Sequence, residues 1–162
     1  MVTTESATIK VPVGMSKYLV TMNPEKLDLS GRSVLLVEDN ELNLEIAKML
    51  LEDEKMVVVT AENGKDAVDI VSRSVPGRFD FIFMDIMMPV MDGLEATRQI
   101  RTLNRIDTKE IPIIAMTANA FTEDRLRAKE AGMDEHISKP VDVKLLLKVI
   151  HKLTENRQKE NA

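Results

Sequence analysis

The chain has 162 residues, of which 44% are hydrophobic and 30% are charged, and this length and composition suit one globular domain with a buried core. The net charge of −5 argues against a broad nucleic-acid-binding surface, which needs clustered lysine and arginine. Cysteine is absent, which excludes disulfides and thiolate metal sites, and no apolar run approaches the roughly 20 residues of a membrane span. We expect a soluble, cytoplasmic domain without nucleic-acid or membrane contact.

The N-terminal residues lack the regular hydrophobic pattern of the rest of the chain. Residues 1–31 have no sustained period and are interrupted by Pro12, Gly14 and Pro24, so we interpret them as an extension or linker. Within them, residues 7–13 alternate loosely and are compatible with a short strand. The pattern sharpens at Ser33, which predicts one domain over residues 32–153 and a polar, frayed tail over residues 154–162.

Short apolar runs predict five strands at residues 33–37, 56–60, 79–85, 111–117 and 135–138, and the first has the composition of a strand buried on both faces. A helical pattern follows the first strand, with one face formed by Leu42, Ile46, Met49 and Leu50. Strands that alternate with five helices through short loops predict a parallel sheet with right-handed crossovers. The predicted class is α/β, a doubly wound five-stranded sheet between two layers of helices.

The other four helices carry recognisable start and stop signals. Asn63 and Asp92 are predicted N-caps, and Glu95 completes a capping box with Asp92. A further helix over residues 122–131 ends before Gly132, which suits a left-handed C-terminal cap. Asp142 is the predicted cap of the last helix.

Polar side chains follow the strands at one edge of the predicted sheet, where open parallel sheets bind ligands. They are Glu38 and Asp39 after the first strand, Asp85 at the end of the third, Thr117 at the end of the fourth and Lys139 after the fifth. Carboxylates brought together raise one another's pKa unless a cation lies among them, and magnesium favours such oxygen ligands. A magnesium site beside a lysine suits phosphoryl transfer, with an aspartate as nucleophile.

Four blocks of the sequence resemble the signature of receiver domains of two-component response regulators. They are V-L-L-V-E-D-N ending at Asn40, F-M-D-I-M-M-P-V-M-D-G around Asp85, A-M-T-A-N-A around Thr117 and S-K-P around Lys139. The resemblance covers about residues 33–152 and is strongest to the receivers of hybrid histidine kinases. It implies a flavodoxin-like fold with strand order 2-1-3-4-5, in which the first and third strands are neighbours.

The resemblance implies roles for the carboxylates. Asp85 is expected to be the phosphoacceptor and, with Asp39, a ligand of Mg2+. Glu38 is expected to hold the ion through water, and the backbone carbonyl of Met87 to be a further ligand. The Glu38–Asp39 pair taken alone would be a helix cap more often than a metal site, with Asn40 as an alternative cap, but the register with Asp85 favours the metal site.

Other positions are assigned by the same resemblance. Lys139 is expected to pair with Asp85 and then with the phosphoryl oxygens, and the Lys139–Pro140 bond to be cis. Thr117 is expected to hydrogen-bond the phosphoryl group, with the small Ala118 leaving room, although by itself Thr117 is equally compatible with a plain strand end.

Two positions bear on switching and on the lifetime of the phosphoryl group. His136 stands where receivers commonly carry Tyr or Phe, and a switch role and an exposed histidine are equally open. Met87 and Asn119 occupy positions that influence phosphoryl loss in this family. Met84 is expected in the core, and a hydrophobic rim around the acceptor is expected from Met87, Met88 and Met91.

The leading hypothesis is a receiver that takes a phosphoryl group from a histidine kinase or histidine phosphotransfer protein and changes conformation. The output or homodimer surface would lie on the last two helices, with Phe121 and Leu126. The chain would be a phosphoacceptor rather than an enzyme, and either free-standing or part of a hybrid kinase. The alternative is a docking module with a vestigial acidic site. A magnesium-dependent phosphatase is disfavoured, because Met87 stands where such enzymes carry a second aspartate.

Overall fold

In the computed structural model, residues 28–118 and 122–160 are described. Residues 7–13, which are compatible with a short strand, and Asn119 and Phe121 therefore lie outside the described residues. Five parallel strands form one sheet in the order β2-β1-β3-β4-β5, which confirms the predicted class and strand order. They are β1 (Ser33–Val37), β2 (Val57–Ala61), β3 (Phe81–Asp85), β4 (Ile113–Thr117) and β5 (Glu135–Ser138).

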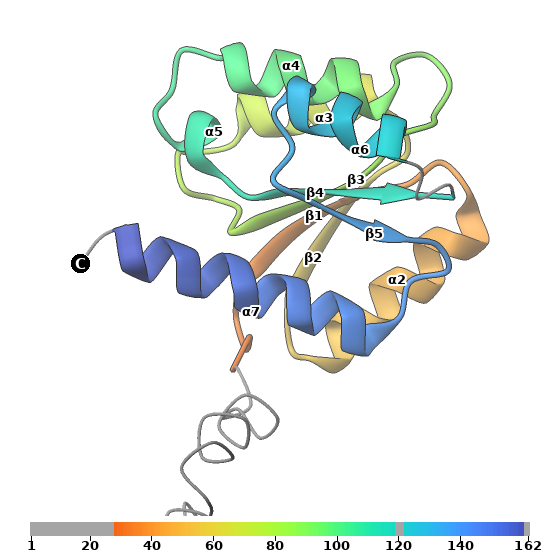
Figure 1. Ribbon diagram of the computed structural model, residues 1–162, viewed down its shortest axis with the longest axis vertical. Coiled ribbons are helices and arrows are strands. Elements are labelled where there is room, and N and C mark those ends of the chain that lie inside the picture. The colour runs from red at the N-terminus through yellow and green to blue at the C-terminus, as the bar shows by residue number, and fades with distance from the viewer. Residues whose placement is uncertain (1–27, 119–121, 161–162) are drawn as a thin grey trace, which may run out of the picture.

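Helices cover both faces of this sheet (Figure 1). On one face lie α2 (Glu41–Asp53) and α7 (Val143–Glu160), which pack on a core cluster with side chains from β1, β3, β4 and β5. On the other face lie α3 (Gly64–Arg73), α4 (Gly93–Thr102) and α6 (Thr122–Ala131), around a second cluster. The strands β1, β3 and β4 are buried throughout, which explains why each reads as a continuous apolar run.

The predicted helix signals are present with one exception. The backbone N–H of Asp66 donates to Asn63 (2.8 Å), and the backbone N–H of Glu95 donates to Asp92 (2.8 Å), so both caps are confirmed. Gly132 has a φ of +110°, the left-handed conformation expected after α6. The Glu95 carboxylate, however, accepts from Arg98 and Gln99, neighbours on its own helix, and not from the Asp92 backbone.

A sixth helix within the described residues was not predicted. It is α5 (Asp107–Glu110), a single turn before β4. One turn is too short to show a hydrophobic period, so the sequence pattern contains no signal for it. Contacts of Asp107 hold it instead. Arg105, two residues earlier, pairs with Asp107 (2.8 Å), and the backbone N–H of the distant Gly77 also donates to Asp107 (3.0 Å).

The buried face of α2 is the opposite of the predicted one. Leu44, Ala47 and Leu51 are buried against the sheet, whereas Leu42 is 69% exposed and Met49 is 62% exposed. The helix carries two apolar stripes, and only tertiary packing decides between them. Leu42, Ile46 and Met49 of the apolar face identified from the sequence pattern therefore face solvent.

The folded part of the chain extends beyond both predicted domain boundaries, residues 32 and 153. Leu29 is 3% exposed and packs in the α2/α7 core, and the N–H of Gly31 donates to the carbonyl of Lys55 (2.9 Å), so the folded unit includes residues assigned to the linker. At the other end α7 continues to Glu160, so residues 154–160 are helical rather than a frayed tail. Glutamate, arginine, glutamine and lysine in this stretch are good helix formers, which polarity alone did not reveal. Among the described helices, none combines the length and apolar character that crossing a membrane requires.

Candidate metal centre

Three carboxylates meet at the carboxyl edge of the sheet. β1 pairs with β3 so that Val37 lies opposite Met84, and the next residues along each strand are therefore neighbours. Glu38, Asp39 and Asp85 each offer an oxygen, and these oxygens all lie within 4.8 Å of one another. Glu38 and Asp85 are buried, whereas Asp39 is exposed at the mouth of the cluster. The structure thus brings together the carboxylates that the strand ends predicted.

Asn40, and not Glu38 or Asp39, is the N-cap of α2. Its side chain accepts from the backbone N–H of Asn43 (2.9 Å), and its own N–H donates to Glu38 (3.1 Å). The alternative in which the acidic pair caps this helix is therefore wrong. Both carboxylates are left to face the centre of the cluster.

Lys139 reaches the cluster from the loop after β5. Its Nζ lies 2.6 Å from Glu38 Oε1 and 2.9 Å from Asp85 Oδ2. The Lys139 backbone N–H donates to the carbonyl of Thr117 (2.8 Å), which ties this loop to the end of β4. The Lys139–Pro140 bond is cis, as the resemblance implied. The contact between Lys139 and Glu38 was not foreseen, because strand-end positions do not reveal side-chain directions.

Burial and the neighbouring charges shift the pKa values of Glu38, Asp85 and Lys139. Burial, followed by the adjacent Glu38 carboxylate, raises the pKa of Asp85 to about 7. Burial also opposes ionisation of Glu38, but hydrogen bonds to Lys139, Asp85 and the Asn40 N–H outweigh it and lower the pKa of Glu38. For Lys139, burial is likewise outweighed, here by the two carboxylates, and its pKa is raised. A second carboxylate charge is therefore costly without a further cation.

The loop after β3 packs directly on Asp85 at the end of that strand. The N–H of Met87 donates to Asp85 Oδ1 (3.2 Å), so the loop backbone contacts the carboxylate itself. A Cβ on Gly93 would overlap the carbonyl oxygen of Asp85, which requires glycine at the start of α4. Val90 has a φ of +70° and is the central residue of a strained γ-turn. The turn is closed by a hydrogen bond from the Met91 N–H to the Pro89 carbonyl (2.7 Å).

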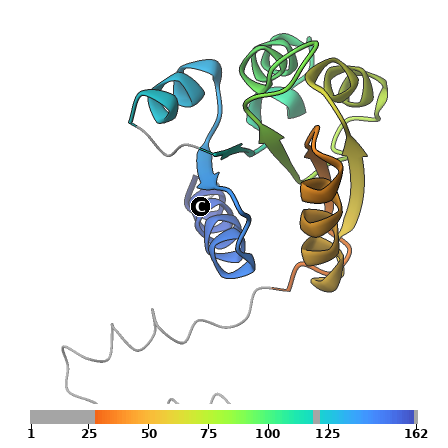
Figure 2. The same cartoon turned by 90° about the vertical axis from the view of Figure 1, so that its right-hand side faces the viewer.

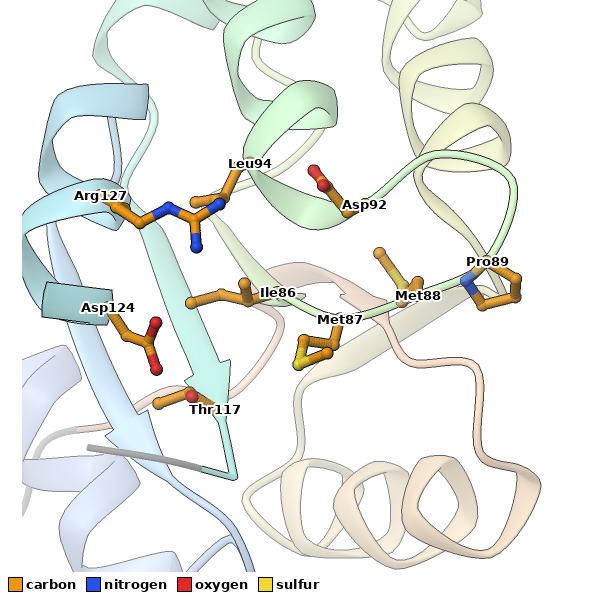
Figure 3. Close-up of a pocket in the computed structure, with 9 residues that line it drawn as sticks. All are labelled: Ile86, Met87, Met88, Pro89, Asp92, Leu94, Thr117, Asp124 and Arg127. Carbon is orange, nitrogen blue, oxygen red and sulfur yellow. The ribbon is translucent and has the colours of Figure 1, made fainter. Parts of the chain in front are cut away.

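A hollow of about 430 Å³ opens beside this loop (Figure 3). Its lining combines apolar side chains of the loop with polar ones from β4 and α6. The lining residues are Ile86, Met87, Met88, Pro89, Asp92, Leu94, Thr117, Asp124 and Arg127. Arg127 and Asp124 extend from α6 toward the loop, and Arg127 remains exposed to solvent while it lines the hollow. A short polar helix gives no signal of this kind, because the hollow depends on how α6 packs.

His136 lies in a different environment from Thr117. It is half-buried and lines a second hollow of about 370 Å³ between α6, β5 and α7, together with Arg125, Lys129 and Lys152. Burial, followed by the charge of Arg125, lowers the pKa of His136. Coupling between this ring and Thr117 stays a prediction. Ala118 is exposed at the end of β4.

The donor set fits a hard divalent cation. The cluster offers only carboxylate oxygens, one of them exposed, and carbonyl or water oxygens are the additional ligands that magnesium takes. One ammonium faces three carboxylates here, so the described cluster carries an excess of negative charge for a cation to balance.

Known proteins with receiver domains match this chain. Hybrid signal transduction histidine kinase I of Dictyostelium discoideum is 39% identical over 132 residues, which cover 77% of this chain and 8% of that protein. Sensor protein GacS of Pseudomonas syringae pv. syringae is 38% identical over 129 residues, covering 78% of this chain and 14% of GacS. The chain thus spans only a small part of the curated relatives that it matches.

Solved structures match about three quarters of this chain. The receiver domain of sensor histidine kinase PA1611 from Pseudomonas aeruginosa PAO1, with magnesium coordinated in its active-site cleft, is 35% identical, with a TM-score of 0.69 over 76% of this chain and 98% of that one. The receiver domain of Saccharomyces cerevisiae Ssk1, co-crystallised with the histidine phosphotransfer protein Ypd1, gives 33% identity and a TM-score of 0.67 over 75% and 87%. The family model of the response regulator receiver domain matches residues 34–151. The chain therefore belongs to the response regulator receiver domain family of two-component and phosphorelay signalling.

Proposed function

We propose that the Asp85 carboxylate accepts a phosphoryl group from the phosphohistidine of a histidine kinase or histidine phosphotransfer protein. The observation that carries this proposal is the position of Asp85, which is buried, 2.9 Å from the Lys139 ammonium and within 4.8 Å of two more carboxylates. A carboxylate oxygen forms the new bond to phosphorus while the bond from phosphorus to the donor imidazole breaks. The chain then acts as a phosphoacceptor and not as an enzyme on other molecules.

Asp39 and Asp85 would hold Mg2+ directly, with Glu38 acting through water and the Met87 carbonyl as a further ligand. When bound, the cation would neutralise charge that develops on the phosphoryl oxygens. The acidic cluster of this chain supports this assignment, and so does the magnesium in the related receiver of PA1611.

Protein groups around Asp85 are suited to orient and neutralise the phosphoryl group. Lys139 can exchange its contact with Asp85 for one with a phosphoryl oxygen, because a phosphoryl group adds roughly −1.5 to −2 charges at this position. Thr117 lies at the end of the adjacent strand β4 and can donate its hydroxyl proton to another of these oxygens. The Met87 N–H already donates to the Asp85 carboxylate and is placed to donate to a third phosphoryl oxygen.

The exposed stripe of α2 is the proposed docking face for the phosphohistidine partner. Leu42, Ile46 and Met49 are large apolar residues that face solvent, and the helix begins two residues after Asp39. A partner that covers this stripe would place its histidine near the acceptor. The complex of Ssk1 with Ypd1 supports a partner of this class.

Phosphorylation would be read on another surface. Movement of Lys139 and Thr117 toward the phosphoryl group would pull on β4, β5 and the helices that flank them. Leu126 on α6 and Leu145 on α7 are exposed there and would form the output or homodimer surface. A cytoplasmic location is part of this proposal, because the histidine-containing donor must reach the site.

Intact-mass spectrometry tests the proposed function. The chain is incubated with acetyl phosphate and Mg2+, and we expect it to gain the mass of one phosphoryl group. A chelator should prevent this gain, and so should Asp85→Asn, which keeps the size of the side chain but removes the nucleophilic carboxylate. A wild-type chain that never gains this mass would favour the docking-module alternative, and an Asp85→Asn chain that does gain it would place the acceptor elsewhere.

A further inference from the structure

The loop between β3 and α4 concentrates methionine sulfur beside the acceptor. Of its three methionines, Met88 and Met91 are partly buried and pack against the α3/α4/α6 core. Met87 is 76% exposed, and among the described methionines only Met49 approaches this exposure. The Met87 thioether is therefore open to small oxidants in solution.

Met87 is also hydrogen-bonded to the proposed acceptor, Asp85. Its backbone N–H donates to Asp85 Oδ1 (3.2 Å), and its side chain lines the 430 Å³ hollow together with Thr117. Figure 3 shows the Met87 side chain extending from the loop on the side that faces Thr117. A chemical change at this sulfur therefore falls on a residue that is hydrogen-bonded to the Asp85 carboxylate and shares a hollow with Thr117.

A peroxide supplies the chemistry. A lone pair of the thioether sulfur attacks one peroxide oxygen, a sulfur–oxygen bond forms and the oxygen–oxygen bond breaks. The departing hydroxide takes up the proton from the oxygen now bound to sulfur and leaves as water, so the sulfur loses two electrons and the peroxide gains them. The product, methionine sulfoxide, is polar where the thioether was apolar, and dedicated reductases reverse the change.

We propose that Met87 is a peroxide-sensitive modification site whose oxidation shortens the lifetime of the phosphoryl group on Asp85. This inference rests on the proposed phosphoacceptor function. An apolar side chain at the mouth of the site limits the approach of water to phosphorus. A sulfoxide oxygen accepts a hydrogen bond from water and holds that water near the acyl phosphate, where hydrolysis needs it.

The test uses the full chain, phosphorylated with acetyl phosphate and Mg2+ and then freed of donor. Decay of the phosphoryl mass is followed in protein that was untreated or pretreated with hydrogen peroxide, and peptide mapping identifies the methionines that gained oxygen. For the wild type we expect a lifetime about threefold or more shorter after oxidation, the effect of one added hydrogen bond to the attacking water. Methionine sulfoxide reductase should restore the original lifetime.

Two variants localise the effect, each compared with its own untreated form. Met87→Leu keeps the apolar volume but cannot form a sulfoxide, so peroxide should leave its lifetime unchanged. Met49→Leu removes the other exposed methionine, which is 62% exposed on α2, and should remain as sensitive as the wild type.

The possible contrary outcomes are distinct. An unchanged lifetime in protein oxidised at Met87 would overturn the inference, as would failure of Met87 to take up oxygen or an equal shortening in Met87→Leu. Untreated protein that never gains a phosphoryl group would instead overturn the proposed function, and this inference with it.

Discussion

The Lys139 ammonium contacts two buried carboxylates at once, at 2.6 Å from Glu38 and 2.9 Å from Asp85. Replacement by glutamine leaves those carboxylates facing each other without a cation. Without divalent ions, we expect Lys139→Gln to lower the free energy of unfolding by about 3 kcal/mol near neutral pH, the cost of removing one partner of a buried pair. Urea denaturation in chelator measures this change.

The loss should depend on pH in a defined direction. The pKa of Asp85 is already raised to about 7, and removal of the ammonium raises it further. A carboxyl whose folded pKa exceeds its unfolded value loses stabilisation as pH rises between the two values, so the deficit of Lys139→Gln should be larger near about pH 8 than near about pH 5. Lys129→Gln, on the exposed face of α6, should change stability by no more than about 0.5 kcal/mol. Equal stability of Lys139→Gln and wild type at the higher pH would contradict this reading of the site.

Met87 is exposed to solvent beside the proposed acceptor, to which its backbone N–H donates. Met87→Asn replaces an apolar side chain by an amide that can hold water, so we expect the phosphoryl group to be lost about threefold or more faster. The decay of the intact phosphorylated mass measures this rate. Val90→Asn places the same amide on an exposed position of the same loop, at a φ of +70° that asparagine tolerates, and should change the rate less than twofold. Equal effects of the two substitutions would argue against a specific role for Met87.

Single residues of the site differ in how far sequence reveals them. Glu38, Asp39, Asp85 and Lys139 were predicted to converge because each follows a strand at the same edge, and the structure places them together. The position of Arg127 beside the 430 Å³ hollow at the β3–α4 loop was not predicted, since it depends on how α6 packs and on the direction of a long side chain.

At the scale of elements, α2 presents an apolar stripe to solvent next to the acceptor. We expect Ile46→Asp to slow phosphoryl transfer from a phosphorylated histidine phosphotransfer protein by about tenfold or more, because a charge would be buried in the interface. Labelling by acetyl phosphate needs no docking and should be retained. Ile106→Asp, on a 78% exposed residue before α5, is the matched control and should transfer normally. Normal transfer to Ile46→Asp would exclude this stripe as the docking face.

The turn before β1 is a second element with a testable role. Leu29 is buried in the α2/α7 core although it was assigned to the linker. Leu29→Ala should lower the free energy of unfolding by about 3 kcal/mol through lost burial and a cavity. Leu42→Ala, at a 69% exposed position, should cost far less in the same urea denaturation experiment. A negligible effect of Leu29→Ala would show that the folded unit starts at β1.

Elements were predictable where their signals are local. Caps at Asn63 and Asp92 and the left-handed Gly132 follow from short motifs, and the structure confirms them. The buried face of α2 and the anchoring of Leu29 depend on what packs against them, which periodicity does not encode.

At the scale of the whole molecule, two cores on either side of one sheet hold β1 and β3 side by side. Figure 2 shows the sheet edge-on between the two groups of helices. Alternating strands and helices predicted this architecture, but the strand order came from the resemblance and not from the pattern itself. Because both acidic strand ends belong to buried neighbouring strands, the carboxylate cluster is fixed by the core of the sheet, while the proposed partner and output surfaces lie on the surrounding helices.

The identity of the acceptor residue tests the account most directly. Borohydride reduces an aspartyl phosphate to homoserine, so peptide sequencing after reduction identifies the side chain that carried the phosphoryl group. After incubation with acetyl phosphate and Mg2+, we predict homoserine in place of Asp85, and no homoserine when a chelator is present. Homoserine at Asp39 or at another aspartate, or an intact Asp85 in a chain that had gained the phosphoryl mass, would contradict the account.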